Sequence, residues 1–114
     1  MPEVGAAEAK QIIDAGSQVI DVRTDVEYDA GHIPGARHIP FADVQRESRS
    51  FDKERPIVIY CRAGNRSGPA ADAFAASGWD AHSIEGGVLS WTEAGFALEP
   101  EDGTVAENPN MPPR

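Results

Sequence analysis

The sequence predicts an α/β domain whose central sheet is mainly parallel. Three runs of strand-forming residues, at 18–22, 57–60 and 81–84, alternate with stretches in which apolar residues recur at helical spacing. The run at 57–60, Ile-Val-Ile-Tyr, is continuously apolar, which is typical of a parallel strand covered on both faces. With 114 residues, the chain is long enough for one domain and too short for two.

The first two elements are a helix and a strand. Apolar residues share one helical face in residues 4–15, and Gly16 follows as a residue that tolerates the positive φ of a helix end. The β-branched run at 18–22 predicts the first strand. Asp25 then stands where it could cap a short helix, because its carboxylate accepts hydrogen bonds from the free N–H groups of a first turn.

The middle of the chain predicts a turn, a short extended piece, a helix and the clearest strand. The sequence His-Ile-Pro-Gly-Ala at 32–36 marks the turn, and residues 37–39 form the extended piece. Residues 41–48 are expected to form a helix with charged residues on its outer side. The strand at 57–60 then leads directly into Cys61.

The last third of the chain predicts two helices with a strand between them. Ser67 is expected to cap a helix that includes residues 70–76, with Pro69 in its first turn. Residues 81–84 form a weaker strand. The pair Gly86-Gly87 opens the final helix.

Composition and charge disfavour several classes of function. Ten Lys and Arg against nineteen Asp and Glu give a formal net charge of -9, which opposes binding to nucleic acid or anionic lipid. No stretch is apolar over the roughly 18 residues that a membrane span needs. Acidic residues stand near the start in place of the basic and apolar residues of a secretory signal. We therefore expect a cytoplasmic protein that binds neither nucleic acid nor membrane.

The composition changes near residue 99. From there to residue 114 the chain is rich in Pro, Glu, Asp, Asn and Gly and poor in apolar residues. The sequence therefore predicts a folded domain over residues 1–98 and an acidic, Pro-containing, solvated tail over residues 99–114.

Cys61 is the only cysteine, which excludes a disulfide, a CxxC redox pair and a multi-cysteine zinc site within one chain. It follows a predicted parallel strand and precedes a helix, at the edge of the sheet where open α/β folds build their sites. The helix N-terminus and two arginines, Arg62 and Arg66, favour the thiolate, and the glycines of the loop allow N–H groups to turn toward one atom. An inert buried thiol is the alternative, but this loop is a poor environment for one.

Ordered motifs connect Cys61 with the rest of the chain. The strand and loop read Ile57-Val-Ile-Tyr-Cys-Arg-Ala-Gly-Asn-Arg-Ser67. Four further motifs are Asp21-Val-Arg23, Glu27-Tyr28, Gly31-His-Ile-Pro-Gly-Ala36 and Gly86-Gly87 with Trp91. Together they resemble the signatures of single-domain rhodaneses, which are sulfurtransferases, over about residues 4–98. The resemblance implies a three-layer α/β fold in which helices flank a five-stranded, mostly parallel sheet.

The resemblance also implies a role for each residue of the loop. Cys61 would take sulfane sulfur from a small anionic, thiosulfate-like donor as a persulfide and pass it to cyanide or a thiol, including a protein thiol. Relatives that use thiosulfate often have a second basic residue where this chain has Ala63. No metal or organic cofactor is required. The binding residues, whose backbone N–H groups would cradle the sulfur, are Arg62, Ala63, Gly64, Asn65 and Arg66, and the two arginines would attract the donor.

Two other functions stay open. A cysteine phosphatase or arsenate reductase of related fold uses Cys-x5-Arg, but residue 67 is serine and Arg66 comes one position early. A noncatalytic rhodanese-like interaction module would share the fold without the activity. Such modules often lack the cysteine, so the presence of Cys61 in an intact loop favours an enzyme.

Residues outside the loop allow only general expectations. Asp21 and Arg23 either help to organise the site or form an ion pair with Glu27 or another neighbour. His32 is expected to make structural hydrogen bonds, as the resembled motif implies. The sequence alone places no histidine beside Cys61.

Overall fold

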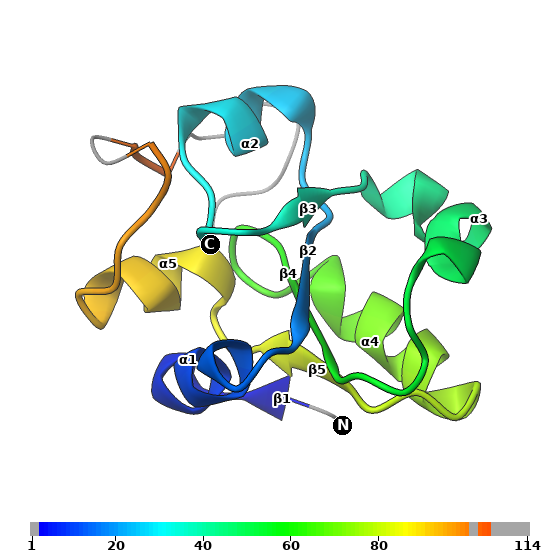
Figure 1. Cartoon of the computed structure of the whole chain (residues 1–114). Coiled ribbons are helices and arrows are strands. Elements are labelled where there is room, and N and C mark those ends of the chain that lie inside the picture. Colours follow the sequence, from blue (N-terminus) through cyan, green and yellow to red (C-terminus); the bar gives the residue numbers. More distant parts are fainter. Residues whose placement is uncertain (1–2, 101–102, 106–114) are drawn as a thin grey trace.

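A computed structural model describes residues 3–100 and 103–105 (Figure 1). At its centre five parallel strands form one sheet in the order β1-β5-β4-β2-β3. The predicted α/β class and the five strands implied by the resemblance are confirmed. The strands are β1 (Glu3–Val4), β2 (Gln18–Asp21), β3 (Arg37–His38), β4 (Ile57–Tyr60) and β5 (Ala81–Ile84).

Helices cover both faces of this sheet, so the domain has three layers (Figure 1). They are α1 (Ala6–Asp14), α2 (Asp25–Ala30), α3 (Val44–Glu47), α4 (Ser67–Ala76) and α5 (Gly87–Glu93). α1 and α5 pack together on one face, and α3 and α4 lie on the other. α2 follows the carboxyl end of β2. The helix expected over 41–48 is irregular, because the 3-10 turns Phe41–Asp43 and Ser48–Ser50 flank α3.

The core explains why β4 is continuously apolar. Its side chains alternate between two hydrophobic clusters: Val58 and Tyr60 pack with residues of α1 and α5, whereas Ile57 and Ile59 pack with residues of α4. All four side chains are fully buried. The alternation continues into Cys61, which packs in the cluster on the α4 face.

The strand β1 lies where the sequence predicts the start of a helix, at residue 4. Glu3 and Val4 pair with Ser83 and Ile84 at the edge of the sheet. A strand of two residues shows no periodicity that could be distinguished from the start of a helix.

The cap of α2 also differs from the prediction. The N-cap is Thr24 and not Asp25, whose side chain is 86% exposed. Thr24 and Glu27 form a capping box in which the hydroxyl of Thr24 accepts from the Glu27 N–H, while Glu27 Oε1 accepts from the Thr24 N–H at 3.0 Å. This reciprocal pair satisfies two backbone donors at the start of α2.

The first residues beyond 98 are exposed or half-exposed, but their backbone is paired with the domain. Glu99 and His32 exchange two backbone hydrogen bonds, with N···O distances of 3.0 and 2.7 Å, and the Thr104 N–H donates to Ala30 O at 2.8 Å. Val105 packs against the cluster on the α1 and α5 face. The rest of the predicted tail, residues 101–102 and 106–114, lies outside the described residues.

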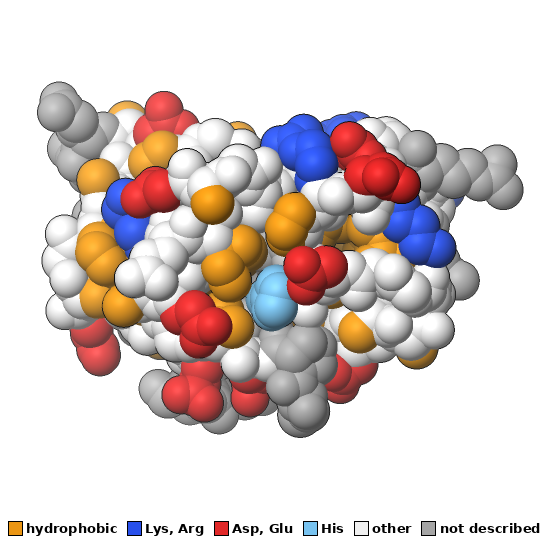
Figure 2. All heavy atoms as spheres, turned by 60° about the horizontal axis from the view of Figure 1, so that its bottom comes forward, with side chains coloured by type: hydrophobic (Ala, Val, Ile, Leu, Met, Phe, Trp, Pro, Cys, Tyr) orange, Lys and Arg blue, Asp and Glu red, His pale blue; other side chains and the backbone are white. Residues whose placement is uncertain are grey.

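The face shown in Figure 2 carries a mixed surface. Acidic side chains are scattered over this face, and basic side chains occur beside them singly or in small groups (Figure 2). Among the described residues, no helix combines the length and the apolar character needed to cross a bilayer.

Candidate active site

The sulfur of Cys61 lies at the carboxyl end of β4, inside the turn that leads to α4. The N–H groups of Gly64 and Arg66 donate to Sγ, at N···S distances of 3.0 and 3.4 Å. Gly64 has a φ of +103°, a conformation that favours glycine and lets the chain curl over the sulfur. Two of the five predicted N–H groups therefore point at the sulfur of Cys61, a residue that is only 1% exposed. Such converging donors stabilise negative charge on the atom they surround.

Ser67 does not cap α4, contrary to the prediction. It is the first residue of the helix, and the N-cap position belongs to Arg66, which makes no side-chain cap. The hydroxyl of Ser67 lies 3.5 Å from Cys61 Sγ and 2.8 Å from the hydroxyl of Ser83 on β5. Ser67 and Ser83 are fully buried, and the contact between them gives both hydroxyls a hydrogen-bond partner. The side chain of Ser67 thus extends the polar surroundings of the sulfur.

The start of α5 holds the same loop from the opposite side. The Val88 and Leu89 N–H groups donate to the carbonyl oxygens of Cys61 and Arg62, at 2.9 and 3.2 Å. Gly87 has a φ of +59°, and a Cβ there would lie 2.5 Å from both carbonyl oxygens. A glycine is therefore required where α5 meets the cysteine, which gives the Gly86-Gly87 motif its physical reason.

Arg66 is neutralised by an acidic residue from α2. Its guanidinium donates to both carboxylate oxygens of Glu27, at 3.0 and 3.2 Å. Burial opposes ionisation of Glu27, but hydrogen bonds from Arg66 and Thr24 outweigh it and lower the pKa of Glu27 from 4.5 to about 2. This ion pair leaves the loop with one uncompensated positive charge, where the sequence predicts two. The sequence does not show that Glu27 packs against the loop.

The other loop residues differ in their contacts. The Arg62 side chain is half-buried, and within residues 3–100 and 103–105 it has no ion pair, while its Nε is buried without a hydrogen-bond partner. Ala63 is half-buried and Asn65 is exposed. Neither contributes to the described hydrogen bonds of Cys61 Sγ. Their roles in binding stay predictions.

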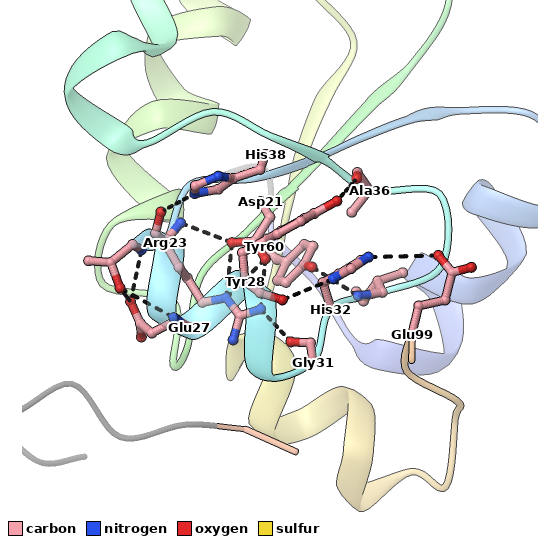
Figure 3. A network of polar contacts seen from close by, with 12 residues as sticks. Asp21, Arg23, Glu27, Tyr28, Gly31, His32, Ala36, His38, Tyr60 and Glu99 are labelled. Carbon is pink, nitrogen blue, oxygen red and sulfur yellow. Dashed lines mark hydrogen bonds and ion pairs between the residues drawn. The ribbon is translucent and has the colours of Figure 1, made fainter. Parts of the chain in front are cut away.

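Asp21 and Arg23 form an ion pair, which is one of the two alternatives that the sequence predicts. They pair with each other and not with Glu27. Both are fully buried, and Arg23 makes three side-chain hydrogen bonds of 2.7–3.0 Å to the Asp21 carboxylate. Arg23 Nη2 also donates to Gly31 O at 2.7 Å, which ties β2 to the end of α2 (Figure 3). By the alternation along β2, Asp21 and Arg23 share the sheet face of Tyr60, whereas Cys61 faces α4.

His32 and His38 both belong to the network of polar contacts in Figure 3. His32 Nδ1 lies 3.0 Å from Tyr28 O, and His38 Nε2 lies 2.7 Å from Arg23 O. Both imidazole rings stack on Tyr28, with centroid distances of 3.8 and 4.7 Å (Figure 3). The third histidine, His82, pairs with Asp80 at 2.8 Å. The expectation that His32 makes structural hydrogen bonds is confirmed.

The Cys61 thiol is thus the reactive group of the candidate site. Within the described residues, no group of three or more His, Cys, Asp or Glu side chains could hold a metal ion. A groove of about 510 Å3 lies along α4 and includes Phe41, Pro69, Phe74 and Trp79, but Cys61 and residues 62–66 do not line it. The loop, and not the groove, carries the arrangement for chemistry: a sulfur nucleophile, converging N–H donors and one uncompensated arginine.

Known proteins are similar to this chain in sequence and in fold. A sequence model of the rhodanese-like domain family matches residues 5–94. The thiosulfate sulfurtransferase GlpE of Pseudomonas paraeruginosa is 36% identical over 105 residues, which cover 91% of this chain and 92% of that protein. A rhodanese-related protein from Thermoplasma volcanium has a solved structure with a TM-score of 0.80 at 28% identity, covering 86% of this chain and 97% of that one. A rhodanese-like domain protein from Staphylococcus aureus has a TM-score of 0.72 at 34% identity, covering 80% and 91%.

Proposed function

We propose that this chain, which belongs to the rhodanese-like domain family, is a sulfurtransferase that carries sulfur on Cys61 as a persulfide. The single observation behind this proposal is the sulfur cradle, in which the Gly64 and Arg66 N–H groups donate to Sγ. A cradle of this kind favours both a thiolate and a persulfide, because each places negative charge on sulfur.

The first step loads the enzyme. The Cys61 thiolate attacks the outer sulfur of a thiosulfate-like donor, a bond forms between Sγ and that sulfur, and the donor's own sulfur–sulfur bond breaks. The electron pair of the broken bond leaves with sulfite when the donor is thiosulfate. The product is a Cys61 persulfide anion, and the total charge is unchanged.

The second step unloads it. Cyanide attacks the terminal sulfur of the persulfide, thiocyanate forms, and the electron pair of the broken bond returns to Sγ as thiolate. A thiol acceptor, including one on a protein, would attack as its thiolate and leave as a persulfide. Because Cys61 is the only cysteine of the chain, the acceptor must come from outside it.

A small anionic donor suits the charges of the loop. Arg62, the residue after Cys61, would supply the uncompensated positive charge, and the similarity to a protein named as a thiosulfate sulfurtransferase supports thiosulfate as the donor to test first. Ala63 stands where thiosulfate-using relatives often have a second basic residue. Other sulfane sulfur donors, such as mercaptopyruvate, therefore belong in the same assay.

A cysteine phosphatase is the less favoured alternative. That chemistry needs an arginine that holds two oxygens of a phosphoryl group. Here the nearest loop arginine, Arg66, stands one residue before the position that the phosphatase motif requires. Its guanidinium already binds both carboxylate oxygens of Glu27. The N–H donors that converge on the Cys61 thiol favour an enzyme over a noncatalytic module.

Steady-state kinetics test the proposal. We expect thiocyanate formation from thiosulfate and cyanide with parallel double-reciprocal lines, as a persulfide intermediate requires, and no turnover by Cys61→Ser. The variant Glu47→Gln, on α3 and without a contact to the loop among the described residues, serves as the matched control with normal turnover. Hydrolysis of p-nitrophenyl phosphate that is lost in Cys61→Ser, without thiocyanate formation from any donor, would instead establish the phosphatase.

A further inference from the structure

We propose that the two arginines of the loop have different roles: Glu27 holds Arg66 as part of the cradle, and Arg62 alone meets the anionic part of the sulfur donor. Glu27 is then a positioning residue that acts on the sulfur through Arg66. The inference rests on the proposed function for its donor, but the geometry behind it concerns the loop itself.

Arg66 links the ion pair to the sulfur. Its backbone N–H donates to Cys61 Sγ at 3.4 Å, and its guanidinium binds both oxygens of Glu27. The side chains are 15% and 1% exposed, so water competes little for this two-pronged contact. A residue fixed at the end of its side chain has little freedom to turn its N–H away from the sulfur.

Glu27 is in turn fixed by α2. Its Oε1 atom accepts from the Thr24 N–H at 3.0 Å and from the Thr24 hydroxyl at 3.1 Å, in addition to Arg66. The helix that carries it is tied down at its other end, where Arg23 Nη2 donates to Gly31 O and the Tyr28 hydroxyl donates to Ala36 O. The position of the cradle is therefore set from a helix far away in the sequence.

The same contact removes Arg66 as a binding charge. A carboxylate and a guanidinium at 3.0 Å present almost no net charge to an approaching anion. The pKa of about 2 keeps Glu27 ionised at neutral pH, so the pair stays neutral overall. Arg62 has no such partner within the part of the chain that the structure describes, and it adjoins Cys61 in the sequence.

Two alkylating reagents of nearly equal size separate the charge effect from changes in access or ionisation of the thiol. Iodoacetate is anionic and iodoacetamide is neutral, so the ratio of their rate constants at Cys61 reports the local charge. We expect Arg62→Gln to lower this ratio about fivefold and Glu27→Gln to raise it, because Arg66 is then uncompensated. The double variant Glu27→Gln/Arg66→Gln should return to the wild-type ratio. A double variant whose ratio falls as far as that of Arg62→Gln would show that Arg66 binds the anion and would overturn the proposal.

Amide hydrogen exchange tests the positioning role. Glu27→Gln keeps an acceptor for the capping box but loses the charge that holds Arg66. We expect the Gly64 and Arg66 N–H groups to exchange about tenfold faster in this variant, while the amides of β4 keep their rates. The control Glu47→Gln removes a partner of two exposed arginines, Arg37 on β3 and Arg46 on α3, and should leave all these rates unchanged.

Unchanged exchange at Gly64 and Arg66 in Glu27→Gln would refute the positioning role. A uniform increase at every slowly exchanging amide would also refute it, since that result indicates general destabilisation. Neither readout requires sulfur transfer. An enzyme that forms no persulfide with any donor would therefore end the proposed function while leaving these two measurements to decide the division of roles.

Discussion

Backbone groups, and not charged side chains, make the direct contacts with the sulfur of Cys61. The Gly64 and Arg66 N–H groups lie 3.0 and 3.4 Å away, and the Ser67 hydroxyl lies at 3.5 Å. Backbone donors keep their positions through the reaction, so they stabilise the charge on sulfur without rearranging. Among the charged residues, Glu27 binds the guanidinium of Arg66, whose N–H belongs to the cradle, and Arg62 follows Cys61 in the sequence.

The Glu27–Arg66 pair predicts how stability depends on pH. The pKa of Glu27 is lowered to about 2 in the folded protein, from an ordinary value of 4.5. A carboxyl whose pKa is lower in the folded state contributes stability above the unfolded pKa, and this contribution disappears as the pH falls toward the folded pKa. We therefore expect the wild type to exceed Glu27→Gln in free energy of unfolding by up to about 3 kcal/mol at neutral pH.

Urea unfolding of both proteins across the acidic range measures this dependence. The difference should hold above a pH of 4.5 and shrink steadily as the pH approaches 2. A difference that is independent of pH would mean that the Glu27 carboxylate does not stabilise the fold through its charge. Glu47→Gln, whose carboxylate is partly exposed, should show a difference close to zero throughout.

The start of α5 packs directly against the loop that follows Cys61. Gly87 combines a positive φ with a position where a Cβ would lie 2.5 Å from two carbonyl oxygens. Gly87→Ala must therefore move the start of α5 away from Cys61. We expect it to abolish persulfide formation and to destabilise the protein by more than the roughly 1 kcal/mol of backbone strain.

Two other glycines provide matched controls for Gly87→Ala. Gly35 has a φ of +82° with open space around its Cβ position, and Gly5 has neither positive φ nor a neighbour within 4 Å. Thermal unfolding should rank the variants Gly5→Ala, Gly35→Ala and Gly87→Ala in order of increasing destabilisation. If Gly35→Ala and Gly87→Ala were equally destabilised and equally active, the close contact between α5 and the loop would not matter.

At the scale of the whole molecule, the chain past residue 98 closes against α2. Glu99 pairs with His32 through two backbone hydrogen bonds, and Thr104 pairs with Ala30. A chain that ends at residue 98 should therefore unfold at lower temperature, because it leaves these backbone groups unpaired and uncovers part of the core next to Val105. A melting temperature equal to that of the full chain would show that these contacts contribute nothing.

Most of the fold follows from local patterns in the sequence. β4 and its neighbours β2 and β5 were predicted because apolar and β-branched runs have a strand's length and composition. β1 was missed because two residues carry no period. The cap at Thr24 was missed because Thr and Asp both serve as caps, and only the position of Glu27 three residues later distinguishes them.

The candidate site was predictable only where it is continuous in sequence. Cys61 and its loop form one segment between a strand and a helix, so their glycines and arginines could be interpreted together. Glu27 and Ser83 enter the site from other elements, and no local pattern indicates which buried residue packs against which loop. The sequence therefore predicts two arginines without an acidic partner in the loop, whereas Arg66 is paired with Glu27.

The most direct test of sulfur transfer through Cys61 is the mass of the intact protein after incubation with a sulfane sulfur donor. Persulfide formation on Cys61 predicts a gain of one sulfur atom with thiosulfate or mercaptopyruvate, its loss on adding cyanide, and no gain in Cys61→Ser. A wild-type protein whose mass is unchanged by every donor would contradict sulfur transfer through Cys61.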